Sequence, residues 1–296
     1  MFINLTEPPQ HTRVVDATQM IGARRLVDQG WDVCRAYLDG YFGEPTVEAR
    51  GAFAGEVARA VATLPERCVV LTAGIPLAQH DPLRFVCNNS AVCGMGAVPI
   101  PYWFEDQSHP VPFASRRYFA TFQGAVTSNP PLREAVVAGF TGCERAVYRV
   151  NENYFHSLSD EDRQALSASY WQLLSETQFS LCPRGDNCGS VRFYESLAAG
   201  CIPVLLADGA ELPLQHMLPW DDMLVRVPEA EADDWPTHVA YWKERRTAPE
   251  LAAQSVFNRH IWHDWFHWSQ LSKQLSVEWA LRAGAANTPS FGGQLT

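Results

Sequence analysis

The chain has 296 residues, 47% of them hydrophobic and 19% charged, and this composition excludes an intrinsically disordered protein. Its 33 acidic and 23 basic residues give a formal net charge of −10, which argues against a nucleic-acid partner. No apolar stretch is long enough to cross a bilayer, and no basic, then apolar, leader opens the sequence. We therefore expect a cytoplasmic protein without a transmembrane segment.

The first hundred residues predict an α/β layer. Residues 49–64 have apolar side chains at helical spacing, and residues 68–73 form a short apolar run typical of a buried strand. Residues 97–101 predict the end of another strand. The polar, proline-bearing segment 104–113 predicts a linker, so we place the first domain at residues 1–112.

The pattern is sharper after the linker. Residues 118–122 predict a strand, and residues 130–138 predict a helix with proline at its start. Residues 159–176 predict a long helix capped by Ser159, with acidic residues in its first turn. We place the second domain at residues 113–258 and a terminal group of helices at residues 259–296.

The clearest unit is a strand, loop, helix and strand within residues 179–208. Apolar runs at residues 179–182 and 201–207 predict two buried strands. Between them, Ser190 can cap a helix over residues 191–199, and Gly200 stands where a helix-terminating glycine belongs. This order predicts a βαβ unit with a right-handed crossover and therefore a parallel sheet.

The loop before this helix suits a diphosphate. A helix N-terminus offers unpaired amides and partial positive charge, and guanidinium groups bind phosphate oxygens in pairs. Arg184 and Gly185 lie in the loop, and Ser190 and Arg192 lie at the helix start. The carboxylate of Glu195 can accept hydrogen bonds from ribose hydroxyls. The same spacing also fits a plain ion pair between Arg192 and Glu195 on a solvated helix face.

A resemblance to a known family supports the first of these interpretations. Residues 179–213 carry CPRG, S-x-R-x-x-E, GCIPV, an acid and LP in this order. Upstream, residues 116–124 read RRYFATFQG and are followed by Arg133; downstream come Trp220 and VRVPE at residues 225–229. These motifs, which span residues 116–229, resemble the exostosin family of glycosyltransferases (family 47).

The resemblance implies a GT-B fold, in which two Rossmann-like domains face a cleft. Residues 1–112 would form a reduced acceptor-side domain, because the chain is short for two full domains, and residues 113–258 would bind the nucleotide sugar. The helices of residues 259–296 would pack back on the first domain.

The resemblance also implies roles for individual residues. Arg184, Gly185, Ser190 and Arg192 would hold the diphosphate, and Glu195 would bind the ribose. The facing side of the cleft near the phosphates would be lined by Arg116, Arg117, Gly124 and Arg133. The loop around the sugar or base would be shaped by Asp208, Leu212 and Pro213.

The implied reaction is inverting transfer of a sugar from a UDP-sugar to a hydroxyl group of a glycan acceptor. Xylose, galactose, glucuronic acid and N-acetylglucosamine are all open as the donor sugar. Arg192 would stabilise the leaving diphosphate. Asp81, which follows His80, is the candidate base, ahead of Glu105 and Asp106. The alternative is an exostosin-like binding or scaffold protein that has lost catalysis.

No metal or other cofactor is expected. The acids Asp160, Glu161 and Asp162 are interpreted as partners of a helix dipole in its first turn and not as a metal motif. The adjacent Asp221 and Asp222 are interpreted as loop or helix-cap residues. His263 and His267 are spaced to bind zinc from one helix face, but no third ligand is apparent, so an aromatic packing helix is preferred. The eight cysteines contain no C-x-x-C pair, and we expect free thiols.

Overall fold

We describe a computed structural model of the chain. It describes residues 98–286 except 103, 152–158 and 186–187, and the backbone of four strands before them. Those strands and a fifth form a parallel sheet in the order β1-β2-β3-β4-β5. They are β1 (Phe2–Asn4), β2 (Asp32–Tyr37), β3 (Cys68–Ala73), β4 (Phe85–Asn88) and β5 (Val98–Pro99). The strands predicted at residues 68–73 and 97–101 are confirmed as β3 and β5, whereas the helix predicted at 49–64 lies outside the described residues.

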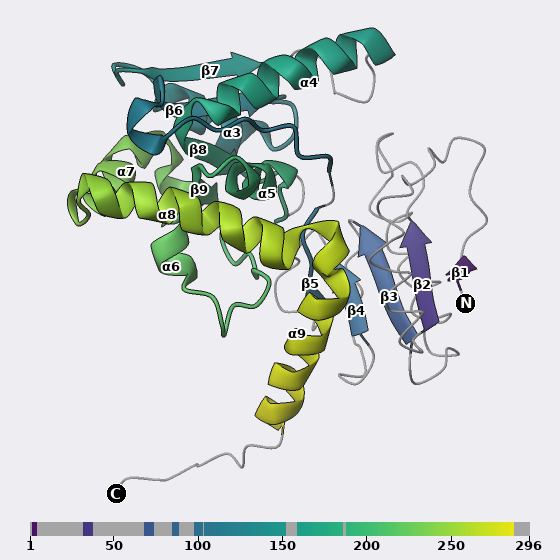
Figure 1. The fold of residues 1–296 in the computed structure, drawn as a ribbon. Coiled ribbons are helices and arrows are strands. Elements are labelled where there is room, and N and C mark those ends of the chain that lie inside the picture. Colours follow the sequence, from purple (N-terminus) through teal and green to yellow (C-terminus); the bar gives the residue numbers. More distant parts are fainter. Residues whose placement is uncertain are drawn as a thin grey trace, which may run out of the picture.

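A second parallel sheet has the order β10-β9-β8-β6-β7. Its strands are β6 (Tyr118–Gly124), β7 (Ala146–Val150), β8 (Thr177–Pro183), β9 (Ile202–Leu206) and β10 (Val225–Arg226). Figure 1 shows the two sheets as separate groups of strands. The predicted α/β class is confirmed, because parallel sheets require crossover connections between their strands.

Helices connect the strands of the second sheet and continue beyond it. They are α3 (Pro130–Ala138), α4 (Asp160–Ser175), α5 (Val191–Ala198), α6 (Trp220–Met223), α7 (Trp235–Glu244), α8 (Ala248–Ile261) and α9 (Leu271–Ala286). A π-helical turn, Trp262–Phe266, follows α8. The predicted bounds of α3 are confirmed, and so is the cap of α4, where the Ser159 hydroxyl accepts from the backbone N–H of Asp162 at 3.1 Å.

The predicted βαβ unit is also confirmed. Strands β8 and β9 pair in parallel, and α5 lies between them in the chain. Gly200 follows α5 with a φ of +66°, a left-handed conformation that glycine adopts without strain. Ser190 is the N-cap residue, but its side chain makes no hydrogen bond to the first turn of the helix. The amides of that turn therefore lack the usual side-chain cap.

Alternating residues of the second sheet divide its core between two faces. On one face, Phe122, Phe179 and Val204 pack with apolar side chains of α3 and α7. On the other face, Cys182 and Leu205 pack with side chains of α5 and the segment after α8. This alternation follows from the two-residue period of a strand. The ends of the strands lie outside the apolar core and can carry polar groups.

The linker and the last helices connect the two sheets. Phe104, in the linker, stacks on Trp262 with ring centroids 4.5 Å apart. Gln274 of α9 donates to the carbonyl oxygen of Pro99 in β5 at 3.0 Å. The boundary predicted at residues 258/259 falls inside α8, which runs to Ile261 (Figure 1). No helix among the described residues has the length and apolar character that a bilayer crossing requires.

Candidate functional site

The site expected from the sequence lies where the strand order of the second sheet reverses. The chain passes from β6 outward to β7 and then returns across β6 to β8. Connections on the two sides of such a switch point leave the sheet in opposite directions, which opens a crevice at the carboxyl ends of the strands. Gly124 ends β6, and Arg184 directly follows β8, so both lie at this crevice.

Arg192 bridges the switch point from the first turn of α5. Its Nη2 donates to the backbone carbonyl of Gln123, and its guanidinium lies over the Phe122 ring, 4.8 Å from the centroid. The Nε of Arg192 is buried and has no hydrogen-bond partner among the residues that the structure describes. A buried unpaired N–H costs free energy and is rare, so it marks a place that a ligand oxygen can complete.

Three neighbouring residues, Gly124, Arg133 and Gly185, lie at the same crevice. A Cβ atom on Gly124 would lie 2.5 Å from Nη2 of Arg192, so a side chain there would displace the guanidinium group. Arg133, on α3, donates from Nε to the carbonyl oxygen of Arg184 at 3.3 Å and from Nη1 to that of Ala125. Gly185 lies against Ser128 and Arg133. The structure therefore brings Gly124, Arg133, Gly185 and Arg192 together, as predicted.

Arg184 reaches the same edge, but a carboxylate already holds it. Its Nε and Nη2 donate to Oε1 and Oε2 of Glu229 at 2.6 and 2.8 Å. Burial opposes the charge on Glu229, yet the hydrogen bonds from Arg184 and from the backbone N–H of Asp208 outweigh it and lower the pKa of that carboxyl. The backbone N–H of Glu229 in turn donates to Asp208 Oδ1 at 3.2 Å.

Glu229 is the residue that sequence reasoning missed. It stands in the VRVPE segment, which supported only the family resemblance, and no role was assigned to it. The available signal was its position shortly after β10, because strand β10 ends at the same edge of the sheet as β8 and β9. Glu229 connects the three strand ends through Arg184 and Asp208.

Glu195 lies one turn along α5 from Arg192 and is held by α4. The hydroxyl of Tyr170 donates to Oε2 of Glu195 at 2.6 Å. Burial raises the pKa of this carboxyl, while the hydrogen bond from Tyr170 and the charge of Arg192 act in the opposite direction. No direct ion pair joins Arg192 and Glu195 among the described contacts, so the plain ion-pair interpretation is wrong in this conformation.

A small open depression lies at the amino end of α5. Ser190 lines it together with Phe193 and Tyr194 of α5 and Leu212 of the loop after β9. Leu212 thus lies close to the amino end of α5.

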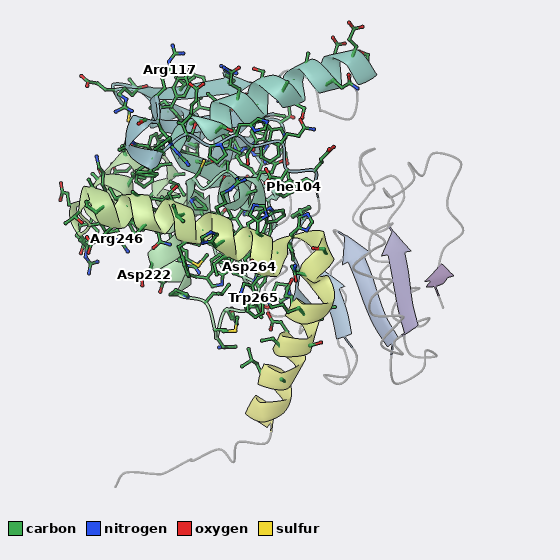
Figure 2. All side chains as sticks on the ribbon, in the orientation of Figure 1. Phe104, Arg117, Asp222, Arg246, Asp264 and Trp265 are labelled. Carbon is green, nitrogen blue, oxygen red and sulfur yellow. The ribbon has the colours of Figure 1, made fainter. Side chains whose placement is uncertain are left out.

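Two predicted site residues lie elsewhere. Arg116 and Arg117 precede β6, at the amino edge of the sheet, whereas the crevice lies at the carboxyl edge. Arg116 is buried and donates to the carbonyl oxygens of Thr177, Gly200 and Ala199. Arg117 is exposed, lies over the Tyr118 ring and projects from the outer surface (Figure 2). The prediction that these two arginines line the cleft is wrong, because the whole length of β6 lies between them and the carboxyl edge.

The structure leaves the catalytic base a prediction. Asp81 and His80 lie outside the described residues. Glu105 is exposed, and Asp106 accepts hydrogen bonds from the backbone N–H and the hydroxyl of Ser108 at 2.9 and 2.6 Å. Asp106 thus fixes the linker and lies near His263 of the π-helical turn, at 4.0 Å.

Within the described part of the chain, no three His, Cys, Asp or Glu residues are grouped as metal ligands. Asp222 pairs with Arg246, and Asp221 pairs with Arg226, so both acids have partners on the surface. The aromatic segment after α8 packs into the core through Trp262 and Phe266, as expected from its sequence. Cys143, Cys182 and Cys201 carry free thiols.

Comparison with known families decides the affiliation of the chain. The family model described as the exostosin GT47 domain matches residues 89–241, just over half of the sequence. The chain belongs to the exostosin GT47 family. The matched segment contains both β8 and α5 with the crevice between them, so the family assignment and the candidate site fall on the same residues.

Curated exostosin relatives match shorter segments. The chain is 42% identical to Exostosin-1c of Danio rerio over 79 residues, which cover 26% of this chain and 11% of the relative. It is 34% identical to the Exostosin-1 homolog of Caenorhabditis elegans over 94 residues, which cover 31% of this chain and 24% of the relative. The chain thus spans at most about a quarter of the length of these exostosins.

Solved structures resemble the chain loosely. The sucrose-phosphate synthase of Thermosynechococcus elongatus is 11% identical, with a TM-score of 0.47 over 95% of this chain and 81% of that chain. The affiliation of this exostosin therefore rests on its sequence match.

Proposed function

We propose that this exostosin is a glycosyltransferase that moves a sugar from a UDP-sugar to a hydroxyl group of a glycan acceptor. The observation that carries the proposal is the buried Nε–H of Arg192 at the switch point of the second sheet, for which the described part of the chain offers no hydrogen-bond partner. A phosphate oxygen is a suitable partner, because charge-assisted hydrogen bonds to phosphate offset the burial of a guanidinium group.

The surrounding residues support a diphosphate at this place. The first turn of α5 has no side-chain cap. Its Phe193 N–H donates to the carbonyl oxygen of Ser190 at 3.2 Å, and the amides of Val191 and Arg192 would meet the anion. Arg133 adds positive charge near the carboxyl end of β6, and the paired guanidinium of Arg184 adds hydrogen-bond donors after β8. Glu195 lies farther along α5, where its carboxylate would accept hydrogen bonds from the ribose hydroxyls. Asp208 and Leu212 would bound the glycosyl or base end.

The proposed reaction inverts the configuration of the anomeric carbon. The acceptor oxygen attacks that carbon, the bond to the diphosphate breaks, and UDP leaves with the electron pair. The arginines stabilise the negative charge that grows on the diphosphate, which is the step where an electrostatic contribution is largest. A carboxylate takes the acceptor proton, and Asp81 remains our candidate for it.

We further propose that the reaction needs no metal ion. Arg133 and Arg192 supply positive charge around the crevice, while Arg184 is paired with Glu229. The donor sugar stays open among xylose, galactose, glucuronic acid and N-acetylglucosamine. A scaffold protein that binds the nucleotide without catalysis is the alternative, and release of UDP from a panel of these donors with a glycan acceptor distinguishes the two.

The binding site is tested by titration calorimetry with UDP. Arg192→Ala should weaken UDP binding about ten- to hundredfold, because a hydrogen bond to a charged group contributes roughly 1.5–3 kcal/mol. Arg117→Ala is the matched control, because each arginine lies over an aromatic ring of β6. The guanidinium of Arg192 lies 4.8 Å from the centroid of Phe122, near the carboxyl end of the strand, and that of Arg117 lies 5.2 Å from the centroid of Tyr118, at its amino end. The control should bind UDP like the unaltered protein.

Two results would contradict the proposal. Equal loss of UDP affinity in both variants would show a general effect of surface charge. No binding of UDP by the unaltered protein would remove the nucleotide site altogether.

A further inference from the structure

A side-chain hydrogen bond from Tyr170 of α4 to Glu195 of α5 joins the two helices at the site. The phenol donates to Oε2 of Glu195 at 2.6 Å, and the two residues are 25 positions apart in the sequence. A carboxylate has two oxygens and about four lone-pair positions. This contact occupies part of one oxygen, and no hydrogen bond to Oε1 is seen among the described residues.

Tyr170 is held firmly by its surroundings. Its ring meets that of Trp171 edge-on, with centroids 5.8 Å apart, and packs against a buried cluster that includes Leu174 and Cys201. Trp171 in turn contacts Phe104 of the linker, with centroids 5.7 Å apart. Burial raises the pKa of Tyr170 well above its ordinary value, so the phenol keeps its proton and remains a donor.

We propose that Tyr170 is a positioning residue that orients the carboxylate of Glu195 for the ribose of the donor nucleotide. By holding Oε2, the phenol fixes the plane of the carboxylate and presents Oε1 to the vicinal hydroxyls. This inference rests on the proposed function, because it assumes that a nucleoside diphosphate occupies the crevice. It adds a residue of α4, outside the βαβ unit, to the recognition of the nucleotide.

The charge state of Glu195 provides an independent consequence. Three groups face this carboxyl: Tyr170 from α4, Arg192 from its own helix and Cys182 from β8. Burial raises the pKa of Glu195, and the hydrogen bond from Tyr170 lowers it. Loss of the phenol therefore raises this pKa further. A protonated carboxyl is a poorer acceptor for the ribose hydroxyls. As the pH is lowered, the UDP affinity of a variant without the phenol should therefore start to fall at a higher pH than that of the unaltered protein.

The test compares two nucleotides in titration calorimetry. Tyr170→Phe removes only the hydroxyl, and it should weaken UDP binding about two- to tenfold. Binding of 2′,3′-dideoxy-UDP, which keeps the base and the diphosphate but lacks both ribose hydroxyls, should not change. Tyr118→Phe, at the amino edge of the second sheet, is the matched control and should leave the affinities for both nucleotides unchanged.

A double-mutant cycle adds a second readout. In a Glu195→Ala background, Tyr170→Phe should have no additional effect on UDP affinity, because the phenol acts through the carboxylate. In the single variant Tyr170→Phe, the acidic decline of UDP affinity should shift to higher pH. A purely structural role of Tyr170 would instead weaken UDP binding further in the Glu195→Ala background and would leave the pH of the acidic decline unchanged.

The outcomes separate this inference from the proposed function. If the unaltered protein binds UDP, and Tyr170→Phe weakens UDP and dideoxy-UDP equally or changes neither, the positioning role is wrong and the nucleotide site stands. If the unaltered protein does not bind UDP, the proposed function fails and the positioning role fails with it.

Discussion

The guanidinium group of Arg116 donates to three backbone carbonyl oxygens at the end of α5 and the start of β8. It also donates to the hydroxyl of Ser255 on α8 at 3.3 Å. Burial lowers its pKa, although the neighbouring Cys201 thiol partly offsets this. Arg116 therefore joins the end of α5 and the start of β8 through their backbone and α8 through a side chain. It does so at the edge of the sheet opposite to the candidate site.

Replacing Arg116 should affect stability and not nucleotide binding. Arg116→Met removes the donors and leaves buried carbonyl oxygens unpaired, which should lower the free energy of unfolding by roughly 1–3 kcal/mol. Urea denaturation measures this loss, and calorimetry on the folded variant should give the UDP affinity of the unaltered protein. Weaker UDP binding at unchanged stability would return Arg116 to the binding site.

At the scale of a single element, α5 shows how short a functional helix can be. It has eight residues, from Val191 to Ala198, and its amino end faces the crevice. Gly200 follows the carboxyl end of the helix, and its φ of +66° turns the chain into β9. The amide of Gly200 donates to the carbonyl oxygen of Leu197 at 2.9 Å. The position of Arg192 thus depends on both ends of this helix.

Gly200→Ala should destabilise the protein more than Gly142→Ala does. Both glycines have positive φ, +66° and +77°, so alanine is strained at either position by roughly 1–3 kcal/mol. A Cβ at Gly200 would also lie 3.0 Å from the carbonyl oxygen of Ser255, whereas one at Gly142 meets nothing within 4 Å. Thermal unfolding of the two variants measures the difference. Equal losses would mean that the contact with Ser255 relaxes freely.

At the scale of the whole molecule, the linker is part of the packed structure. Phe104 stacks on Trp262 and contacts Trp171, so it touches both α4 and the segment after α8. Ser108 accepts a hydrogen bond from Arg259 of α8 at 2.9 Å. These contacts hold the segment between β5 and β6 against the second sheet and its helices.

We expect Phe104→Ala to lower the free energy of unfolding by roughly 2–4 kcal/mol, because it removes a partly buried aromatic ring from a stacked cluster. Gln107→Ala, at an exposed position of the same segment, is the matched control and should change stability by less than about 0.5 kcal/mol. Chemical denaturation measures both. If the two variants lose the same small amount, the stacking of Phe104 does not hold the linker.

Local patterns were sufficient to predict much of the second sheet and its helices. Residues 130–138 and the region around α5 carry their own start and stop signals, namely proline, Ser190 and Gly200, and such signals act within a few residues. Strand β7 was not predicted, and its exposed Tyr148 and Val150 explain why: a strand at the edge of a sheet lacks a strongly apolar pattern.

The sequence by itself determined that a helix between two parallel strands would begin beside Arg192. It also determined that the chain resembles the exostosins. Only the tertiary structure decided which arginines meet there. Arg116 and Arg133 stand in the same motif, yet β6 carries one to the amino edge and α3 returns the other to the carboxyl edge. Glu229 and Tyr170 became part of the site through strand order and helix packing, which join residues far apart in the chain and leave no local pattern.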